Sequence, residues 1–244
     1  NAEYILTGDD QKYQQEVYKK IDTIVAVSET VHNQLQSVFP EYTDKLAIMP
    51  DLINEKLIYQ MSQEFIPDID SSKKILLTVA RLDKNQKGYD ILLETCRELK
   101  KITDNFVWYI IGEGPFRKEM EVFIMTHGLS DCLILLGAKS NPYPYMAAAS
   151  IYVQTSRNEG FGLSIAESLI LNKPVVTTEY GCVYVQMKQG LNGFVCSFDP
   201  EEIAGKIDYL LQNTSVCDKM AEFSNTQKKG NTQNITIFYD LLNK

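Results

Sequence analysis

The chain has 244 residues, of which 44% are hydrophobic and 23% are charged, so it can bury a core and is neither disordered nor fibrous. This length allows one large domain or two small ones. The 24 basic and 32 acidic residues give a net charge of −8, which argues against broad nucleic-acid binding and favours small-molecule partners, because the net field repels phosphates.

The first 55 residues predict a single strand-helix-strand unit that follows one more helix. The expected elements are a helix at 10–20, a strand at 23–27, a helix at 29–38 and a strand at 46–49. The third of these begins after Ser28, a residue type that favours helix starts. One such unit is too small to be a domain. The polar stretch 60–74, which contains Pro67, predicts a linker to the rest of the chain.

From residue 72 onward, short apolar segments alternate with helical patterns. Continuous apolar runs are typical of strands covered on both faces, and parallel neighbours need helical crossovers. We therefore predict an α/β fold with a doubly wound, Rossmann-like parallel sheet. The predicted strands are 75–80, 106–111, 132–136, 151–155, 174–178 and 194–197. The predicted helices are 89–102, 115–127, 143–150, 164–171 and 200–212.

The tail after Asn213 is polar and then carries apolar residues at helical spacing. We expect a final helix there, packed on the N-terminal unit. The predicted organisation is an N-terminal piece at 1–59, a linker at 60–74, a main domain at 75–222 and a C-terminal helical segment at 223–244.

The sequence predicts a cytoplasmic protein. Its apolar runs are far shorter than the roughly 20 residues that cross a bilayer, and its N-terminus lacks the pattern of a secretory signal. The five cysteines show no CxxC pair, which favours reduced thiols over a disulfide or zinc framework. Peripheral association with the inner face of the membrane stays open, although no basic or apolar patch for it is visible.

Ligands of open parallel sheets bind beyond the carboxyl ends of the strands. After the first strand, Arg81 and Lys87 bring two cations to that edge, and such a pair suits a diphosphate. Charged loop residues are usually only solvated, so this signal alone is weak. After the second strand, Gly112 opens a turn where the backbone can approach a ligand closely, without the third glycine of a dinucleotide fingerprint.

The strongest candidate site follows the fourth strand, in the segment NEGFGLSIAE. Its two glycines let the backbone curl before a helix, whose unpaired amides and dipole suit a phosphate oxygen. Glu159 and Glu167 can then face one cleft and accept hydrogen bonds from hydroxyl groups. For Glu167, a capping box with Ser164 is an equally good explanation that needs no ligand. Glu159 has no such structural explanation, which favours a function for it.

These residues resemble the donor-site signature of retaining family-4 glycosyltransferases of the GT-B fold. The segment EGFGLSIAESLILNKPVV carries an E-x7-E pair, and VARLDKNQKG, IIGEGP, LLGAK and GLNGFV occur in the family's order. The N-terminal stretches IDTIVAVSE and LAIMPDLIN resemble the last strands of that family's acceptor domain. The resemblance therefore covers nearly the whole chain.

The resemblance implies a role for each matching residue. Arg81 and Lys87 would hold the diphosphate and stabilise the charge on the leaving nucleotide. Glu159 would face the donor sugar near the reacting centre, and Glu167 would bind the ribose hydroxyls. The residues implied in catalysis are Glu159, Arg81 and Lys87. Those implied in donor binding are Gly112, Gly137, Ala138, Lys139, Gly160, Phe161, Gly162, Leu163, Ser164 and Glu167.

The same resemblance implies a retaining enzyme that moves a sugar from a nucleotide sugar, a UDP-sugar in the first instance, to a glycan or lipid-linked acceptor. Bacterial surface or capsular polysaccharide synthesis is the expected pathway. No metal ion and no further cofactor are implied. Most of the acceptor domain lies outside this sequence, so we expect no transfer by the chain alone. A non-catalytic nucleotide-sugar binding subunit that needs a partner chain is the alternative.

Two other enzyme classes fit the sequence less well. An NAD-dependent oxidoreductase would use the same sheet, but Arg81 and Lys87 stand where its glycine fingerprint belongs. A metal-dependent transferase could use the two aspartates of Asp68-Ile69-Asp70, but this DxD lies in the polar linker and two spaced aspartates recur by chance in an acidic chain.

Overall fold

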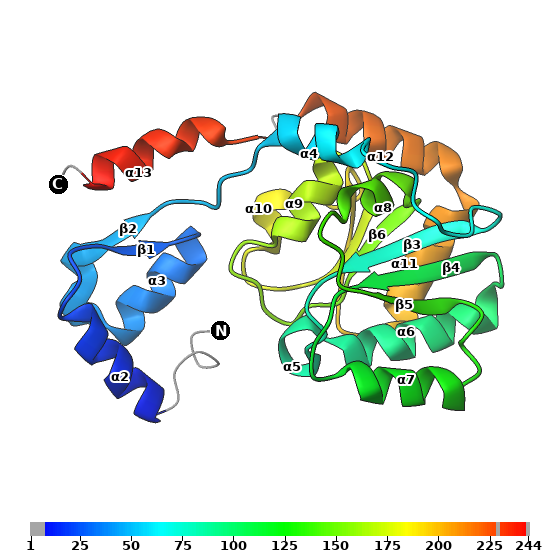
Figure 1. Ribbon diagram of the computed structural model, residues 1–244, viewed down its shortest axis with the longest axis horizontal. Coiled ribbons are helices and arrows are strands. Elements are labelled where there is room, and N and C mark those ends of the chain that lie inside the picture. Colours follow the sequence, from blue (N-terminus) through cyan, green and yellow to red (C-terminus); the bar gives the residue numbers. More distant parts are fainter. Residues whose placement is uncertain (1–7, 228–229, 243–244) are drawn as a thin grey trace.

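The computed structural model describes residues 8–227 and 230–242, which form a small N-terminal unit and a larger α/β domain (Figure 1). The N-terminal unit contains α2 (Gly8–Tyr18), β1 (Ile24–Ala26), α3 (Glu29–Val38), a 3-10 helix η1 (Pro40–Lys45) and β2 (Leu46–Ile48). Strands β1 and β2 pair in parallel. Ser28 accepts a hydrogen bond from the Val31 N–H at 3.3 Å, which confirms the predicted start of α3.

The main domain is built on a parallel sheet of six strands in the order β5-β4-β3-β6-β7-β8, so the predicted fold class is confirmed. Each strand agrees with its prediction to within one residue at either end. The chain moves outward from β3 in one direction and from β6 in the other, which makes the boundary between β3 and β6 a topological switch point. The strands are β3 (Lys74–Val79), β4 (Phe106–Ile111), β5 (Leu133–Gly137), β6 (Ile151–Gln154), β7 (Val175–Thr178) and β8 (Gly193–Cys196).

Helices cover both faces of this sheet (Figure 1). One face carries α6 (Tyr89–Ile102), α7 (Arg117–Thr126) and α11 (Pro200–Gln212), which pack on inward side chains such as Trp108 and Val153. The other face carries α4 (Glu55–Ser62), α8 (Tyr143–Ala148), α9 (Leu163–Ile170) and α10 (Val183–Gln186), which pack on Leu77 and Tyr152. Helix α12 (Thr214–Thr226) packs against α11 of the first face and against α9 of the second. Every strand is therefore covered twice, as its continuous apolar run predicts.

Helices α4, α10 and α12 are not among the helices expected from the sequence, whereas the final helix is. Helix α12 was not predicted, because only Met220 and Ser224 of its residues are buried and its sequence looks polar. Helix α4 covers the start of the predicted linker at 60–74 and packs against α8 and α9. The final helix α13 (Ile235–Leu242), preceded by η2 (Thr232–Asn234), is confirmed, but none of its residues is buried. Its packing on the N-terminal unit and the domain boundaries stay predictions.

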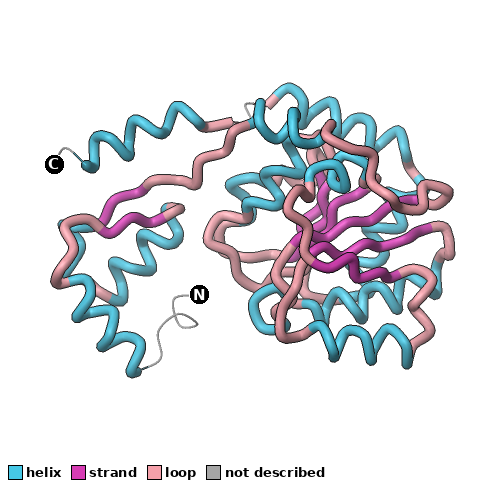
Figure 2. The backbone as a smooth tube through the Cα atoms, in the orientation of Figure 1, coloured by secondary structure: helices cyan, strands magenta, loops and turns pink. Residues whose placement is uncertain are grey.

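The segment between β2 and α4 connects the N-terminal unit with the main domain (Figure 2). Asn231, which precedes η2, binds this segment. Its Oδ1 accepts from the Ile53 N–H at 2.6 Å, its Nδ2 donates to the Asp51 carbonyl at 2.8 Å, and its N–H donates to the Ile53 carbonyl at 3.2 Å. The segment before α4 and the segment before η2 are thus held together by these three hydrogen bonds.

Candidate functional site

The loops that follow β3 and β6 bring Lys87 and Glu159 together at the switch point. The Nζ of Lys87 lies 2.7 and 2.9 Å from the two carboxylate oxygens of Glu159. Both side chains are largely shielded, with 19% of Lys87 and 8% of Glu159 exposed. The sequence predicted that both residues lie at this edge of the sheet, but the direct ion pair between them was not expected.

Gly88 allows the loop after β3 to approach the loop after β6 closely. Gly88 ends the short helix α5 (Lys84–Lys87) with φ of 63°, and a Cβ there would lie 2.0 Å from the carbonyl oxygen of Thr155. The hydroxyl of Thr155 lies 3.0 Å from the Gly88 carbonyl oxygen, to which it donates. Because the loop is held against the end of β6, Lys87 at its tip stands beside Glu159.

Two further side chains bind Glu159, and sequence reasoning missed both. Gln154 Nε2 donates to Glu159 Oε1 at 2.9 Å, and the Ser156 hydroxyl donates to the same oxygen at 2.7 Å. On its other side, Gln154 Oε1 lies 3.2 Å from the hydroxyl of Tyr152. The available signal was their position, since polar residues at the carboxyl end of a buried strand face the ligand edge.

Arg81 lies at the rim of the site. Its Nη2 is 3.2 Å from Asp83 Oδ2 and 3.4 Å from Gln86 Oε1, and 63% of its side chain is exposed. The hydrogen bonds of Glu159 do not include Arg81. Its predicted contact with a diphosphate stays a prediction, and the exposed, weakly held guanidinium has the freedom to turn toward one.

The glycine-rich turn ends at Gly162, which is the N-cap residue of α9 with φ of 87° and no side-chain hydrogen bond. A Cβ at Gly162 would lie 2.8 Å from the hydroxyl of Tyr180. Since α9 begins at Leu163, Ser164 stands inside the first turn, and the suggested capping box with Glu167 is wrong. Within the described part of the chain, the backbone N–H groups of Leu163 and Ser164 have no hydrogen-bond partner.

Glu167 is half-buried and bound on one side only. The hydroxyl of Tyr143, from the start of α8, donates to Glu167 Oε1 at 2.9 Å. Burial raises the pKa of the Glu167 carboxyl above its ordinary value, and the hydrogen bond from Tyr143 opposes that rise. The sequence did not indicate Tyr143. The Glu167 carboxylate is therefore oriented by a neighbouring helix, as a ligand-binding group would be.

The other predicted donor-binding residues lie on the loops after β4 and β5. Gly112 has φ of 148°, and a Cβ there would lie 1.9 Å from the Ala80 carbonyl oxygen, so the loop after β3 already requires this glycine. Gly137 has φ of 73° at the end of β5. Ala138 and Lys139 are exposed, and the Lys139 Nζ lies 6.0 Å from the ring centre of Tyr145. These residues take no part in the hydrogen bonds of Glu159 or Glu167.

The N-terminal unit approaches the same region. A Cβ at Gly160 would lie 3.2 Å from Val27 Cγ2, and one at Gly181 would lie 3.3 Å from Thr30 Cγ2. Val27 and Thr30 flank the start of α3. The carboxyl end of β1 therefore faces the glycine-rich turn across the gap between the two units.

A family model described as "Glycosyl transferases group 1" matches residues 60–229, which is more than half of the chain. The chain belongs to this glycosyltransferase family. The family and the GT-B type of fold that the motifs predicted are thus confirmed, whereas the retaining subtype stays a prediction.

Relatives and solved structures agree with this assignment. An uncharacterized glycosyltransferase of Methanocaldococcus jannaschii is 26% identical over 197 residues, which cover 79% of this chain and 46% of the relative. The N-acetylgalactosamine-N,N'-diacetylbacillosaminyl-diphospho-undecaprenol 4-alpha-N-acetylgalactosaminyltransferase of Campylobacter jejuni is 32% identical over 164 residues. These residues cover 67% of this chain and 43% of the relative. HepE of Anabaena in complex with UDP and glucose has the same fold, with a TM-score of 0.84 at 18% identity. The match covers 98% of this chain and 68% of HepE. The chain thus spans about half the length of these curated relatives.

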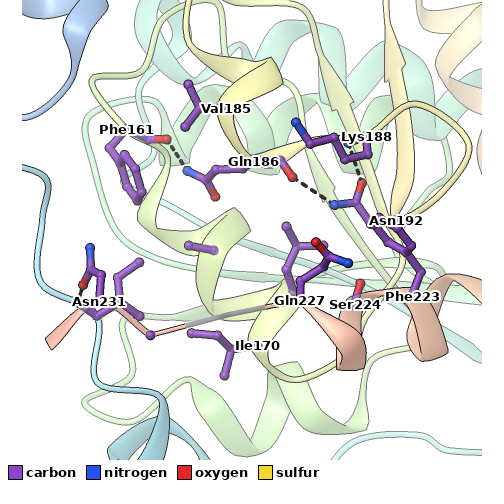
Figure 3. Close-up of a pocket in the computed structure, with 14 residues that line it drawn as sticks. Phe161, Ile170, Val185, Gln186, Lys188, Asn192, Phe223, Ser224, Gln227 and Asn231 are labelled. Carbon is purple, nitrogen blue, oxygen red and sulfur yellow. Dashed lines mark hydrogen bonds between the residues drawn. The ribbon is translucent and has the colours of Figure 1, made fainter. Parts of the chain in front are cut away.

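A cavity of about 290 Å³ lies beside the glycine-rich turn of this glycosyltransferase domain (Figure 3). Gln186 supports the turn from there, because its side-chain Nε2 donates to the Phe161 carbonyl while its backbone carbonyl accepts from Asn192 Nδ2 at 2.9 Å. Neither Glu159 nor Glu167 lines this cavity. We therefore assign the cavity to the packing behind the turn and not to the site itself.

The described residues contain neither a cluster suited to a metal ion nor a helix that could span a membrane. Over residues 8–227 and 230–242, no group of three or more His, Cys, Asp or Glu side chains is arranged to hold a metal ion. Asp70 of the DxD pair accepts two hydrogen bonds from Ser72 and so closes a turn. All five cysteines are unpaired, and no helix in these ranges is long and apolar enough to cross a bilayer.

Replacing Glu167 with glutamine is expected to stabilise the glycosyltransferase domain at neutral pH. Because burial raises the pKa, this group contributes stability below its ordinary value of 4.5, and the contribution is lost as the pH rises through the folded-state pKa. Glu167→Gln removes the buried charge and keeps an oxygen for Tyr143. Thermal unfolding should show a higher Tm for the variant at neutral pH and a smaller difference below pH 4.5. A variant less stable than the wild type at neutral pH would contradict the raised pKa.

Proposed function

We propose that this chain carries the donor site of a retaining glycosyltransferase, which transfers a sugar from a nucleotide sugar to a glycan or lipid-linked acceptor. The observation that carries the proposal is the meeting of Lys87 and Glu159 at the switch point, beside the start of α9. The Lys87 cation and the unpartnered N–H groups of α9 suit a diphosphate, and the Glu159 carboxylate suits the hydroxyls of a sugar.

Each of these groups has a task in the proposed reaction. The diphosphate draws Lys87 away from Glu159, turns Arg81 inward from the rim, and accepts hydrogen bonds from the N–H groups of Leu163 and Ser164. These contacts stabilise the negative charge that builds on the leaving nucleotide. Glu159 then accepts a hydrogen bond from the donor sugar. The Glu167 oxygen that Tyr143 leaves unoccupied accepts from a ribose hydroxyl.

The acceptor enters from the side of the N-terminal unit, which we propose to be the end of an acceptor domain. Its hydroxyl attacks the anomeric carbon from the face that the phosphate leaves. The bond from that carbon to the acceptor oxygen forms as the bond to the phosphate oxygen breaks, and the departing phosphate takes the hydroxyl proton. The anomeric configuration is therefore kept, with no step that needs a metal ion. Without most of the acceptor domain, this chain binds the donor but does not transfer.

The names of similar proteins support the substrate classes in this proposal. The Campylobacter relative is named for an undecaprenol-diphosphate-linked acceptor, which favours a lipid-linked or surface glycan. The Anabaena structure is titled as a complex with UDP and glucose, which favours a UDP-sugar. A cytoplasmic enzyme at the inner face of the membrane, active in bacterial surface polysaccharide synthesis, fits both.

Calorimetric titration with UDP, GDP and ADP tests this donor site, on the chain and on the full-length protein that contains it. We expect saturable binding of UDP, weakened about tenfold or more by Arg81→Ala and by Glu167→Ala, since each removes a hydrogen-bonding group from the nucleotide. Arg97→Ala is the matched control, because Arg97 is 40% exposed on α6 and pairs with Glu94 at 2.7 Å. Failure of the full-length protein to bind any of the three nucleotides would refute the proposal.

A further inference from the structure

The two oxygens of the Glu159 carboxylate have different surroundings. Oε1 accepts from Lys87 at 2.7 Å, from Gln154 at 2.9 Å and from Ser156 at 2.7 Å. Among the residues that the structure describes, only Lys87 donates to Oε2, at 2.9 Å. A carboxylate oxygen offers about two lone-pair sites, so Oε1 is saturated while Oε2 can accept another hydrogen bond.

The amide of Gln154 has only one favourable orientation. Its side chain is 2% exposed, and its Oε1 lies 3.2 Å from the Tyr152 hydroxyl, which can donate to it. If the amide were reversed, its oxygen would face Glu159 Oε1 across the 2.9 Å that the hydrogen bond now spans. Two acceptors at that distance repel each other, so the Nε2 donor points at Glu159.

We propose that Gln154 and Ser156 are positioning residues that hold Glu159 Oε1, so that Oε2 alone meets the donor sugar and accepts from one of its hydroxyls. This inference rests on the proposed function of Glu159 in donor binding. It adds that Oε2 is the oxygen that binds the sugar, that Gln154 and Ser156 keep the carboxylate in place, and that a sugar hydroxyl lies opposite Oε2.

The arrangement matters when the diphosphate draws Lys87 away. Oε1 then still has two donors, Gln154 at the end of β6 and Ser156 just beyond it, and the carboxylate stays oriented. Oε2 loses its only partner at the same moment. A buried acceptor without a donor is costly, so this oxygen favours a ligand that supplies a hydroxyl.

The test is a comparison of variants in the full-length protein, with nucleotide release from UDP-glucose, UDP-N-acetylglucosamine and GDP-mannose in water as the assay. In Gln154→Met, Tyr152 can still donate to the Val79 carbonyl at 3.2 Å, and Glu159 keeps Lys87 and Ser156. We expect kcat to fall about 10- to 100-fold with KM and UDP affinity unchanged, as for a misplaced reacting group. Adding Ser156→Ala should lower kcat to the level of Glu159→Gln.

Thr177→Val is the matched control. Thr177 is the register partner of Gln154 on β7 and is 1% exposed. Within residues 8–227 and 230–242, its hydroxyl has only the Thr178 carbonyl, at 3.4 Å, as a partner. This variant should keep the wild-type kcat. A crystal structure of Gln154→Met should also show the Glu159 carboxylate turned away from its present orientation.

The possible outcomes separate the two proposals. Wild-type kcat in Gln154→Met, together with an inactive Glu159→Gln, would overturn the positioning role and leave the donor site standing. A fall in UDP affinity equal to the fall in kcat would show a general structural defect and would also overturn it. Full activity of Glu159→Gln would overturn the proposed function itself, and the inference with it.

Discussion

Replacing Glu159 with glutamine is expected to abolish sugar transfer by the full-length protein, with kcat lower by roughly 1,000-fold, the size of effect seen when one preorganised electrostatic contact to a transition state is lost. Glutamine has the same shape but no charge. Its amide cannot accept from Gln154, Ser156 and a sugar hydroxyl together, as the carboxylate can once Lys87 has moved to the diphosphate. UDP affinity should change little, because Arg81, Lys87 and the start of α9 remain.

Glu179→Gln is the matched control for this variant. Glu179 also follows a strand of the same sheet, is exposed, and accepts from the Tyr184 hydroxyl at 3.1 Å. It should retain wild-type kcat in the same assay of nucleotide release. Normal turnover by Glu159→Gln, with the control equally active, would remove Glu159 from the reaction.

The sheet could be predicted from the sequence because helices pack on both of its faces, so that most of its strands are buried and appear as short apolar runs. β4 is the clearest case, with all its residues buried and its bounds matching the prediction. Helix α12 was missed for the opposite reason. It lies on the outside of the domain and buries only Met220 and Ser224, so its sequence carries little apolar periodicity.

The site was predicted as far as loops and topology determine it. Strand order places the loops after β3 and β6 at one switch point, which is why Lys87 and Glu159 could be assigned to the same edge. Gln154 and Tyr143, which bind Glu159 and Glu167, could not be predicted. Their contacts depend on side-chain directions, which the spacing of residues in the sequence does not indicate. The capping box failed because the N-cap residue of α9 is the left-handed Gly162, two residues before Ser164.

Removing Lys87 from its ion pair with Glu159 is expected to destabilise and to inactivate the protein, for two separable reasons. Lys87→Met leaves a carboxylate that is only 8% exposed without its cation. Loss of one partner of a shielded pair costs about 3 kcal/mol in the free energy of unfolding. The double variant Lys87→Met/Glu159→Gln removes both charges at nearly constant volume, so most of that stability should return.

Urea unfolding of the wild type, both single variants and the double variant measures this coupling, and nucleotide release measures activity in the same four proteins. We expect the double variant to be more stable than Lys87→Met and yet as inactive, since Lys87 has to bind the diphosphate and Glu159 the sugar. Recovery of activity along with stability would mean that the pair serves only the fold. A double variant no more stable than Lys87→Met would instead mean that the cost arises from packing and not from the unpaired charge.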